Sequence, residues 1–209
     1  MDRARRQGLT ATGRDPLNER GDDLYETPLV AVHALLKHVH LPTHIWEPAA
    51  GLGAISRPLR EAGKIVYATD LVDHGDPLTE SRIDFLMEYR PPIGCGAIVT
   101  NPPFKLADQF VRHALFQIKV PMVVMLLRLA FLEGTGRIDI LDIHSPTVYL
   151  FRNRLPRMHR AGWTGARASS SIAFAWYVWT QDRKGPLEVH RITWENLPDD
   201  GRETDQRPL

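Results

Sequence analysis

The sequence predicts a doubly wound α/β fold, with a Rossmann-like, mostly parallel sheet covered by helices on both faces and an antiparallel C-terminal hairpin. Three observations support this prediction. Short β-branched runs alternate with stretches of helical periodicity through the first two thirds of the chain. These runs lack the apolar–polar alternation of half-exposed strands, as expected for strands buried on both faces. In the last third, strand-like segments follow one another without helices between them.

The first helix should begin at Pro28, which suits the first turn of a helix, with Thr27 as the candidate N-cap. Its apolar residues recur at helical spacing, and we expect it to end before Pro42. The following elements are predicted as strands at 44–47, 65–70, 97–100 and 122–127 and helices at 54–61 and 106–116. The last third should hold strands at 147–151, 171–179 and 187–194, the final two joined by a hairpin turn over 181–186.

The composition is that of an ordinary globular chain, with 209 residues, 43% hydrophobic and 24% charged. This length favours one domain. The single cysteine, Cys95, allows no internal disulfide, so we expect a reducing, cytoplasmic location. The longest apolar run, 120–130, contains Arg128 and is too short to span a bilayer, so no membrane association is expected.

Charge and apolar content divide the chain into three parts. Residues 1–23 carry five basic and five acidic side chains with little apolar periodicity, and we expect a flexible arm there. Residues 24–197 should form the folded domain. Residues 198–209 are acidic, with almost no large apolar side chain, and are predicted to be a disordered tail.

A glycine-rich turn is expected between the first strand and the next helix, over 47–53. Glycines at this position let a ligand approach backbone amides at the switch point of the sheet. Ser56 stands where a dinucleotide fingerprint has its third glycine, which disfavours NAD and FAD. Asp70 follows Gly51 by 19 residues, at a strand end where a carboxylate can accept from ribose hydroxyls. An adenosine-type ligand without pyrophosphate is therefore favoured.

A second motif, Asn101-Pro102-Pro103-Phe104, follows the strand at 97–100. Two prolines hold the backbone rigid and lack N–H groups, so nearby carbonyls can face a donor in the cleft. The oxygens of Asn101 and Pro102 suit an exocyclic amino group, and Phe104 offers an aromatic face to a planar base.

These two motifs together resemble the amino-group methyltransferases that use S-adenosylmethionine, particularly the N6-adenine DNA methyltransferases. The resemblance spans about 25–179 and implies the class I methyltransferase fold. It implies that Asn101, Pro102, Pro103 and Phe104 are catalytic. The cofactor residues that it implies are Tyr25, Thr27 and Pro28 in an N-terminal motif, Glu47, Pro48, Ala49, Gly51 and Gly53 in the loop, Asp70 with Leu71, Asp84 with Phe85, and Asn101.

The resemblance leaves the substrate open. DNA adenine is the leading interpretation, while enzymes with this motif also modify rRNA or a glutamine in a protein release factor. A catalytically silent nucleotide-binding module is the non-enzymatic alternative, and the intact catalytic motif argues against it.

The chain departs from the DNA-modifying relatives because no separate target-recognition domain follows the final hairpin. Recognition would then come from the loop over 152–170, be weak, or be supplied by a separate specificity subunit or another copy of the chain. This loop contains a basic cluster and one aromatic side chain as nucleic-acid-binding candidates: Arg152, Arg154, Arg157, Arg160, Trp163 and Arg167.

Other chemistries find little support. Four histidines between His33 and His44 have no cysteine or carboxylate to complete a ligand set, so no metal site is predicted. Cys95 lies outside any Pro-Cys pair, which leaves a covalent cytosine-C5 mechanism without a nucleophile. Trp176, Trp179 and Trp194 fall in predicted strands and are expected in the core.

Overall fold

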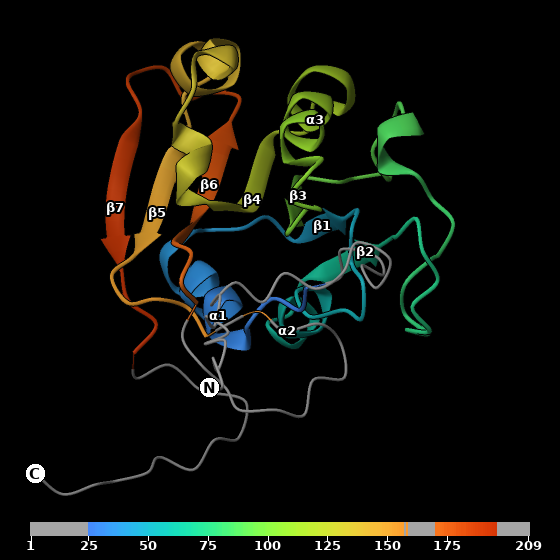
Figure 1. The fold of residues 1–209 in the computed structure, drawn as a ribbon. Coiled ribbons are helices and arrows are strands. Elements are labelled where there is room, and N and C mark those ends of the chain that lie inside the picture. The colour runs from blue at the N-terminus through green and yellow to red at the C-terminus, as the bar shows by residue number, and fades with distance from the viewer. Residues whose placement is uncertain (1–24, 157, 159–169, 196–209) are drawn as a thin grey trace, which may run out of the picture.

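The computed structural model describes residues 25–156, 158 and 170–195, and the predicted N-terminal arm and acidic tail lie outside these residues. One seven-stranded sheet runs through the molecule in the order β2-β1-β3-β4-β6-β5-β7 (Figure 1). The strands are β1 (His44–Glu47), β2 (Ile65–Ala68), β3 (Ala97–Thr100), β4 (Met122–Arg128), β5 (Thr147–Phe151), β6 (Phe174–Thr180) and β7 (Glu188–Ile192).

The pairing directions confirm the predicted fold class. Strands β2, β1, β3 and β4 pair in parallel, with Ile45 opposite Val66 and Ala97 opposite Met122. Strand β6 is antiparallel to both β4 and β5, which forms the antiparallel C-terminal part. Six strands therefore end at one edge of the sheet, where β6 begins, and we call this the carboxyl edge.

The prediction that the last two strands pair as a hairpin is wrong, because β6 and β7 are not neighbours in the sheet. Strand β7 lies beyond β5 and pairs with it in parallel, so the turn after β6 leads across β5 instead of into a hairpin. Burial explains this order. Residues 174–179 of β6 are all buried, which suits a central strand, whereas β7 is exposed at four of its five positions and suits the edge.

Helices cover both faces of the sheet, as predicted. Figure 1 shows α1 (Leu29–His38) and α2 (Ser56–Glu61) on one side and α3 (Ala107–Arg112) on the other. Side chains of each strand alternate between the two cores. Ile45 packs with α1 and α2, whereas its neighbour Trp46 packs with α3.

Several helical segments are short or tightly wound. The predicted helix at 106–116 is split, because α3 continues as the π-helical turn η3 (His113–Ile118) and ends at Lys119 with φ +58°. Helix α2 begins two residues later than predicted, because the glycine turn extends to Ile55. The remaining segments are η2 (Phe85–Met87), η4 (Leu129–Leu132), η5 (Thr135–Arg137) and the π-helical η6 (Asp139–Ile143).

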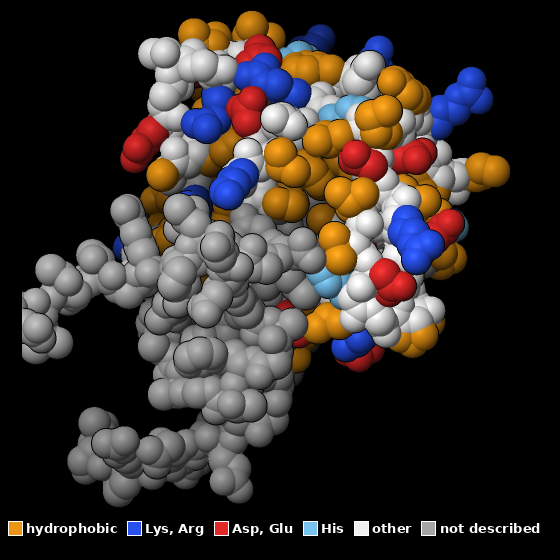
Figure 2. Space-filling model, turned by 45° about the vertical axis from the view of Figure 1, so that its right-hand side comes forward, with side chains coloured by type: hydrophobic (Ala, Val, Ile, Leu, Met, Phe, Trp, Pro, Cys, Tyr) orange, Lys and Arg blue, Asp and Glu red, His pale blue; other side chains and the backbone are white. Residues whose placement is uncertain are grey.

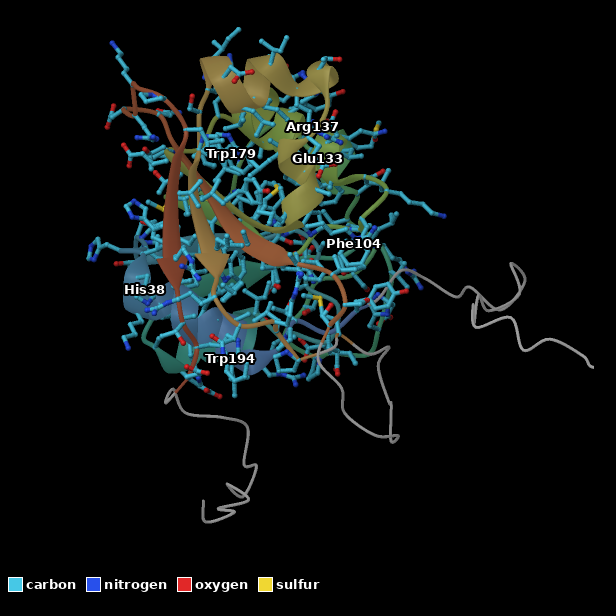
Figure 3. All side chains as sticks on the ribbon, turned by 60° about the vertical axis from the view of Figure 1, so that its left-hand side comes forward. His38, Phe104, Glu133, Arg137, Trp179 and Trp194 are labelled. Atoms are coloured by element: carbon cyan, nitrogen blue, oxygen red, sulfur yellow. The ribbon has the colours of Figure 1, made fainter. Side chains whose placement is uncertain are left out.

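Two of the three tryptophans are in the core, as expected. Trp176 and Trp179 are buried, and their indole N–H groups donate to the carbonyls of Ala31 in α1 and Ile140 in η6. Trp194 is only partly buried. Figure 3 shows Trp179 beside the helical segments above the sheet and Trp194 near α1.

The sheet edge at β2 is less well covered than its centre. Only η2 lies in the segment between β2 and β3, so Ile65 and Tyr67 remain exposed. Figure 2, which brings this side forward, shows hydrophobic side chains among scattered charges on the surface. No helix among the described residues is long and apolar enough to cross a membrane.

Candidate active site

A cleft of about 290 Å³ opens at the carboxyl edge, where β1, β2 and β3 end. Its walls come from the segment before α1, the glycine turn after β1, the loop after β2 and the start of the segment after β3. This is the position at which open α/β sheets bind their ligands. The carboxyl edge therefore brings together both motifs of the sequence.

The glycine turn is held to β2 through Asp70. Gly51 adopts φ +54°, a conformation that favours glycine, and its N–H donates to Asp70 Oδ2 at 2.8 Å. The other oxygen of Asp70 accepts from the Val72 N–H at 2.9 Å. Each carboxylate oxygen has a second lone pair, so Asp70 retains acceptor capacity toward a ligand in the cleft.

His74 lies beside the same carboxylate. Its Nε2 is 3.7 Å from Asp70 Oδ1, and its side chain is largely buried at the cleft wall. Sequence reasoning did not identify this histidine. The sequence feature that could have indicated it is its position four residues after Asp70.

Glu47, the last residue of β1, brings a buried carboxyl group to the cleft. Its side chain is 1% exposed, and Oε2 has no hydrogen-bond partner among the described residues. Burial raises the pKa of Glu47 well above its usual value. A buried carboxyl group with one oxygen left without a partner fits a cationic ligand, because a nearby positive charge stabilises the ionised form.

The loop after β2 ends in a small acidic and apolar group. Asp84 caps η2 by accepting from the Leu86 N–H at 3.0 Å. Asp84 and Leu86 line the cleft, while Phe85 turns away into the core and packs against Trp46 and Phe110. The arrangement provides a carboxylate beside apolar side chains, which suits a planar base with a polar edge.

Asn101, at the end of β3, has an amide whose orientation is fixed. Its Nδ2 donates to Thr27 Oγ1 at 3.1 Å and faces the Tyr25 carbonyl at 3.5 Å. A backbone carbonyl can only accept, so the amide nitrogen must be on this side. Asn101 Oδ1 is buried and has no partner among the described residues. A buried acceptor without a partner has given up its hydrogen bonds to water and gained none in the protein, which costs about 1–3 kcal/mol of folding free energy.

Phe104 is covered by two neighbouring groups. The Tyr25 ring stacks on it with centroids 5.4 Å apart, and the guanidinium carbon of Arg128 lies 4.1 Å from its centroid. A second pocket, of about 320 Å³, adjoins these three residues and Phe174. A ligand that stacks on Phe104 from this pocket must displace Arg128.

The structure brings most of the sequence-predicted site residues to one cleft. The lining contains Tyr25, Thr27, Glu47, Pro48, Ala49, Gly51, Asp70, Leu71, Asp84, Asn101, Pro102, Pro103 and Phe104. Three predicted cofactor residues do not line it: Pro28, Gly53 and Phe85. Pro28 is the N-cap residue of α1, which begins at Leu29, so the predicted start at Pro28 and the predicted cap at Thr27 are wrong. Gly53, at φ +78°, closes the glycine turn by donating to the Ala50 carbonyl.

The predicted nucleic-acid loop is described only in part. Arg152 and Arg154 are exposed side chains after β5. The other candidates, Arg157, Arg160, Trp163 and Arg167, lie outside the described residues. No cluster of three or more histidine, cysteine or acidic side chains that could hold a metal occurs in the described part of the chain.

No protein-family profile matches this chain, and no curated protein sequence matches it. Solved structures do resemble it. The 23S rRNA methyltransferase ErmE has a TM-score of 0.52 and 17% identity, over 76% of this chain and 68% of that chain. A dimethyladenosine transferase from Plasmodium falciparum has a TM-score of 0.50 and 13% identity, over 75% of this chain and 62% of that chain.

A third match is the methyltransferase subunit of a type I restriction-modification system from Streptococcus thermophilus. It has a TM-score of 0.54 and 14% identity, over 81% of this chain and 47% of that chain. The present chain therefore spans about half the length of that subunit. At these identities the likeness is one of fold, and the chain has the Rossmann-like fold of class I methyltransferases.

The Asp70 contacts yield a stability prediction. Asp70→Ala removes the acceptor of the Gly51 and Val72 amides, and hydrogen bonds to a charged group are worth about 1.5–3 kcal/mol each. The variant should lose at least about 1.5 kcal/mol of unfolding free energy, measured by chemical denaturation. Asp73→Ala is the control, since exposed Asp73 accepts only from the Gly75 N–H among the residues that the structure describes. Equal stability of both variants would show that Asp70 does not hold the turn.

Proposed function

We propose that this protein is an S-adenosylmethionine-dependent methyltransferase that modifies the N6 amino group of adenine in DNA. The observation that carries the proposal is the Asn101 amide, whose nitrogen is held by Thr27 and whose buried oxygen has no partner. An exocyclic amine supplies the donor that this oxygen lacks. The fold shared with methyltransferases of rRNA and of restriction-modification systems supports the reaction class.

The residues of the cleft fit S-adenosylmethionine. Glu47 would face the positively charged part of the cofactor, because its carboxyl group is buried and its Oε2 has no partner among the described residues. Asp70 would accept from the ribose hydroxyls, and Asp84 with Leu86 would contact the adenine ring. When bound, this cofactor supplies an electrophilic methyl group on a sulfonium.

The chain itself would contribute alignment of the acceptor. Asn101 Oδ1 and the Pro102 carbonyl would accept from the amino N–H groups, which directs the nitrogen lone pair into the cleft. The base would stack on Phe104 after Arg128 leaves the ring. Arg128 would then be free to pair with a substrate phosphate. Alignment of this kind requires neither a metal nor a nucleophilic side chain.

An RNA base is the alternative substrate, and the likeness to rRNA-modifying enzymes favours it over a protein glutamine. The chemistry at Asn101 would be the same, because RNA adenine presents the same amino group. The two proposed substrates differ only in whether the bound strand is DNA or RNA.

The first functional prediction separates chemistry from binding. Asn101→Ala should abolish methyl transfer while affinity for S-adenosylmethionine, measured by calorimetry, stays within a few-fold. Phe104→Ala should cost about 1–3 kcal/mol of stacking, a smaller loss of activity. Gln109→Ala is the matched control, because it removes an exposed amide from α3. Full activity of the Asn101 variant would overturn the proposed mechanism.

The second functional prediction concerns pH. Burial raises the pKa of Glu47 in the free protein, and a bound cation should lower it, so cofactor binding should release a proton. Affinity for S-adenosylmethionine should therefore rise with pH until the raised pKa is passed. Calorimetry in two buffers of different ionisation enthalpy measures the released proton.

The control for this measurement is Glu47→Gln, which keeps the shape of the side chain and removes its titration. The variant should bind without the proton release that depends on Glu47. Identical proton release in the wild type and in the Gln variant would contradict the assigned contact.

A further inference from the structure

A third pocket, also on the carboxyl edge, is lined by three arginines. It has a volume of about 220 Å³ and lies where β5 and β7 end and β6 begins. Arg152 and Arg154 come from the segment after β5, and Arg191 comes from β7. All three side chains are exposed, and no carboxylate lines the pocket.

The three positive charges are not neutralised within the described part of the chain. None of them has an ion-pair partner there, whereas Arg57, Arg112 and Arg183 each pair with an aspartate or glutamate. Glu195 accepts from the amide of Asn153, which lines the pocket, at 2.5 Å, and it does not line the pocket itself. Three unpaired guanidinium groups around one hollow favour an anion with several oxygens.

The backbone that carries these arginines is fixed. Leu150 of β5 pairs with Arg191 of β7, and the Arg152 N–H donates to the Ile192 carbonyl at 2.8 Å. Leu155, beside Arg154, is 2% exposed, and its carbonyl accepts from the Ser170 N–H at 2.9 Å. The pocket is therefore built on paired strands and a buried anchor.

The pocket shares one wall residue with the pocket beside Phe104. Phe174 lines both this pocket and the one that adjoins Phe104 and Arg128. In the sheet order, β5 lies three strands from β3, which carries Asn101 at its end. Three strand spacings are about 14 Å, which corresponds to about four nucleotides along one strand of a duplex at 3.4 Å each. Figure 3 labels Phe104 at the acceptor side and Trp194 after β7. The indole N–H of Trp194 donates to the carbonyl of Asn153, which lines the arginine pocket.

We propose that Arg152, Arg154 and Arg191 bind a backbone phosphate of the nucleic-acid substrate, a few nucleotides from the target base. This inference rests on the proposed function, and it deepens it by identifying a contact to the backbone of the nucleic-acid strand. A phosphodiester offers two free oxygens to the guanidinium forks, and it carries no sequence information. The contact therefore positions the strand and leaves base selection to other residues.

The test is the salt dependence of DNA binding by the full chain. Fluorescence anisotropy with a short labelled duplex gives log affinity against log salt, and each phosphate contact contributes about 0.9 to the slope. The double variant Arg154→Gln, Arg191→Gln should reduce the slope by up to about 0.9, the contribution of one phosphate contact. It should weaken binding to all sequences alike. Arg90→Gln is the matched control, an exposed arginine between β2 and β3 that lies outside this pocket.

Two further arms distinguish the sources of phosphate. Inorganic phosphate and adenosine monophosphate, added as competitors at equal ionic strength, should displace the duplex only at much higher concentrations. If either binds as tightly as the duplex, the pocket serves a small phosphate ligand and the proposal is overturned. A double variant with unchanged slope and unchanged thermal stability also overturns it.

Failure of this proposal is distinguishable from failure of the proposed function. Binding is measured without methyl transfer, so a wild-type slope in the double variant together with methylated adenine contradicts only the phosphate site. A reduced slope without methyl transfer to any nucleic acid supports the phosphate site and contradicts the proposed function.

Discussion

The candidate site depends on the hydrogen bond between the Asn101 amide and Thr27. It joins residues 74 positions apart and ties the segment before α1 to the end of β3. Because the Tyr25 carbonyl also faces the amide nitrogen, the side chain cannot turn over without placing two oxygens against each other. The buried oxygen is thereby committed to an external donor, which is the property that the proposed chemistry uses.

The sheet assembles the remaining groups around this point. Strands β1, β2 and β3 run in parallel and end together, so the glycine turn, Asp70 and Asn101 meet although they are separated in the sequence. The contact between Gly51 and Asp70 joins two of these strand ends directly. Because β4, β5 and β7 end at the same edge, Arg128 and the arginine pocket extend the site along the sheet.

Much of this arrangement could be predicted from local patterns. The glycine turn, the acid 19 residues later and the Asn-Pro-Pro-Phe motif each follow a short apolar run, and parallel strands bring such positions to one edge. The position of β7 could not be predicted from the turn over 181–186, because strand order depends on which side chains must be buried from both sides. The burial of residues 174–179 places β6 inside the sheet and leaves the edge position to β7.

Contacts between distant segments were also beyond the sequence. The spacing gives no sign that Arg128 lies over Phe104, since one ends β4 and the other follows β3. His74 and Leu86 line the cleft because of the path of the chain after β2, an irregular loop and the single short turn η2, which has no periodic signal. Arg191 joins Arg152 and Arg154 only because β7 pairs with β5.

Transfer of a labelled methyl group from S-adenosylmethionine to DNA, RNA and protein in parallel tests the central claim most directly. After digestion of the nucleic acids, the account predicts label in DNA, in the nucleoside N6-methyldeoxyadenosine. Label confined to RNA or protein, or found in DNA on any other atom, would contradict it.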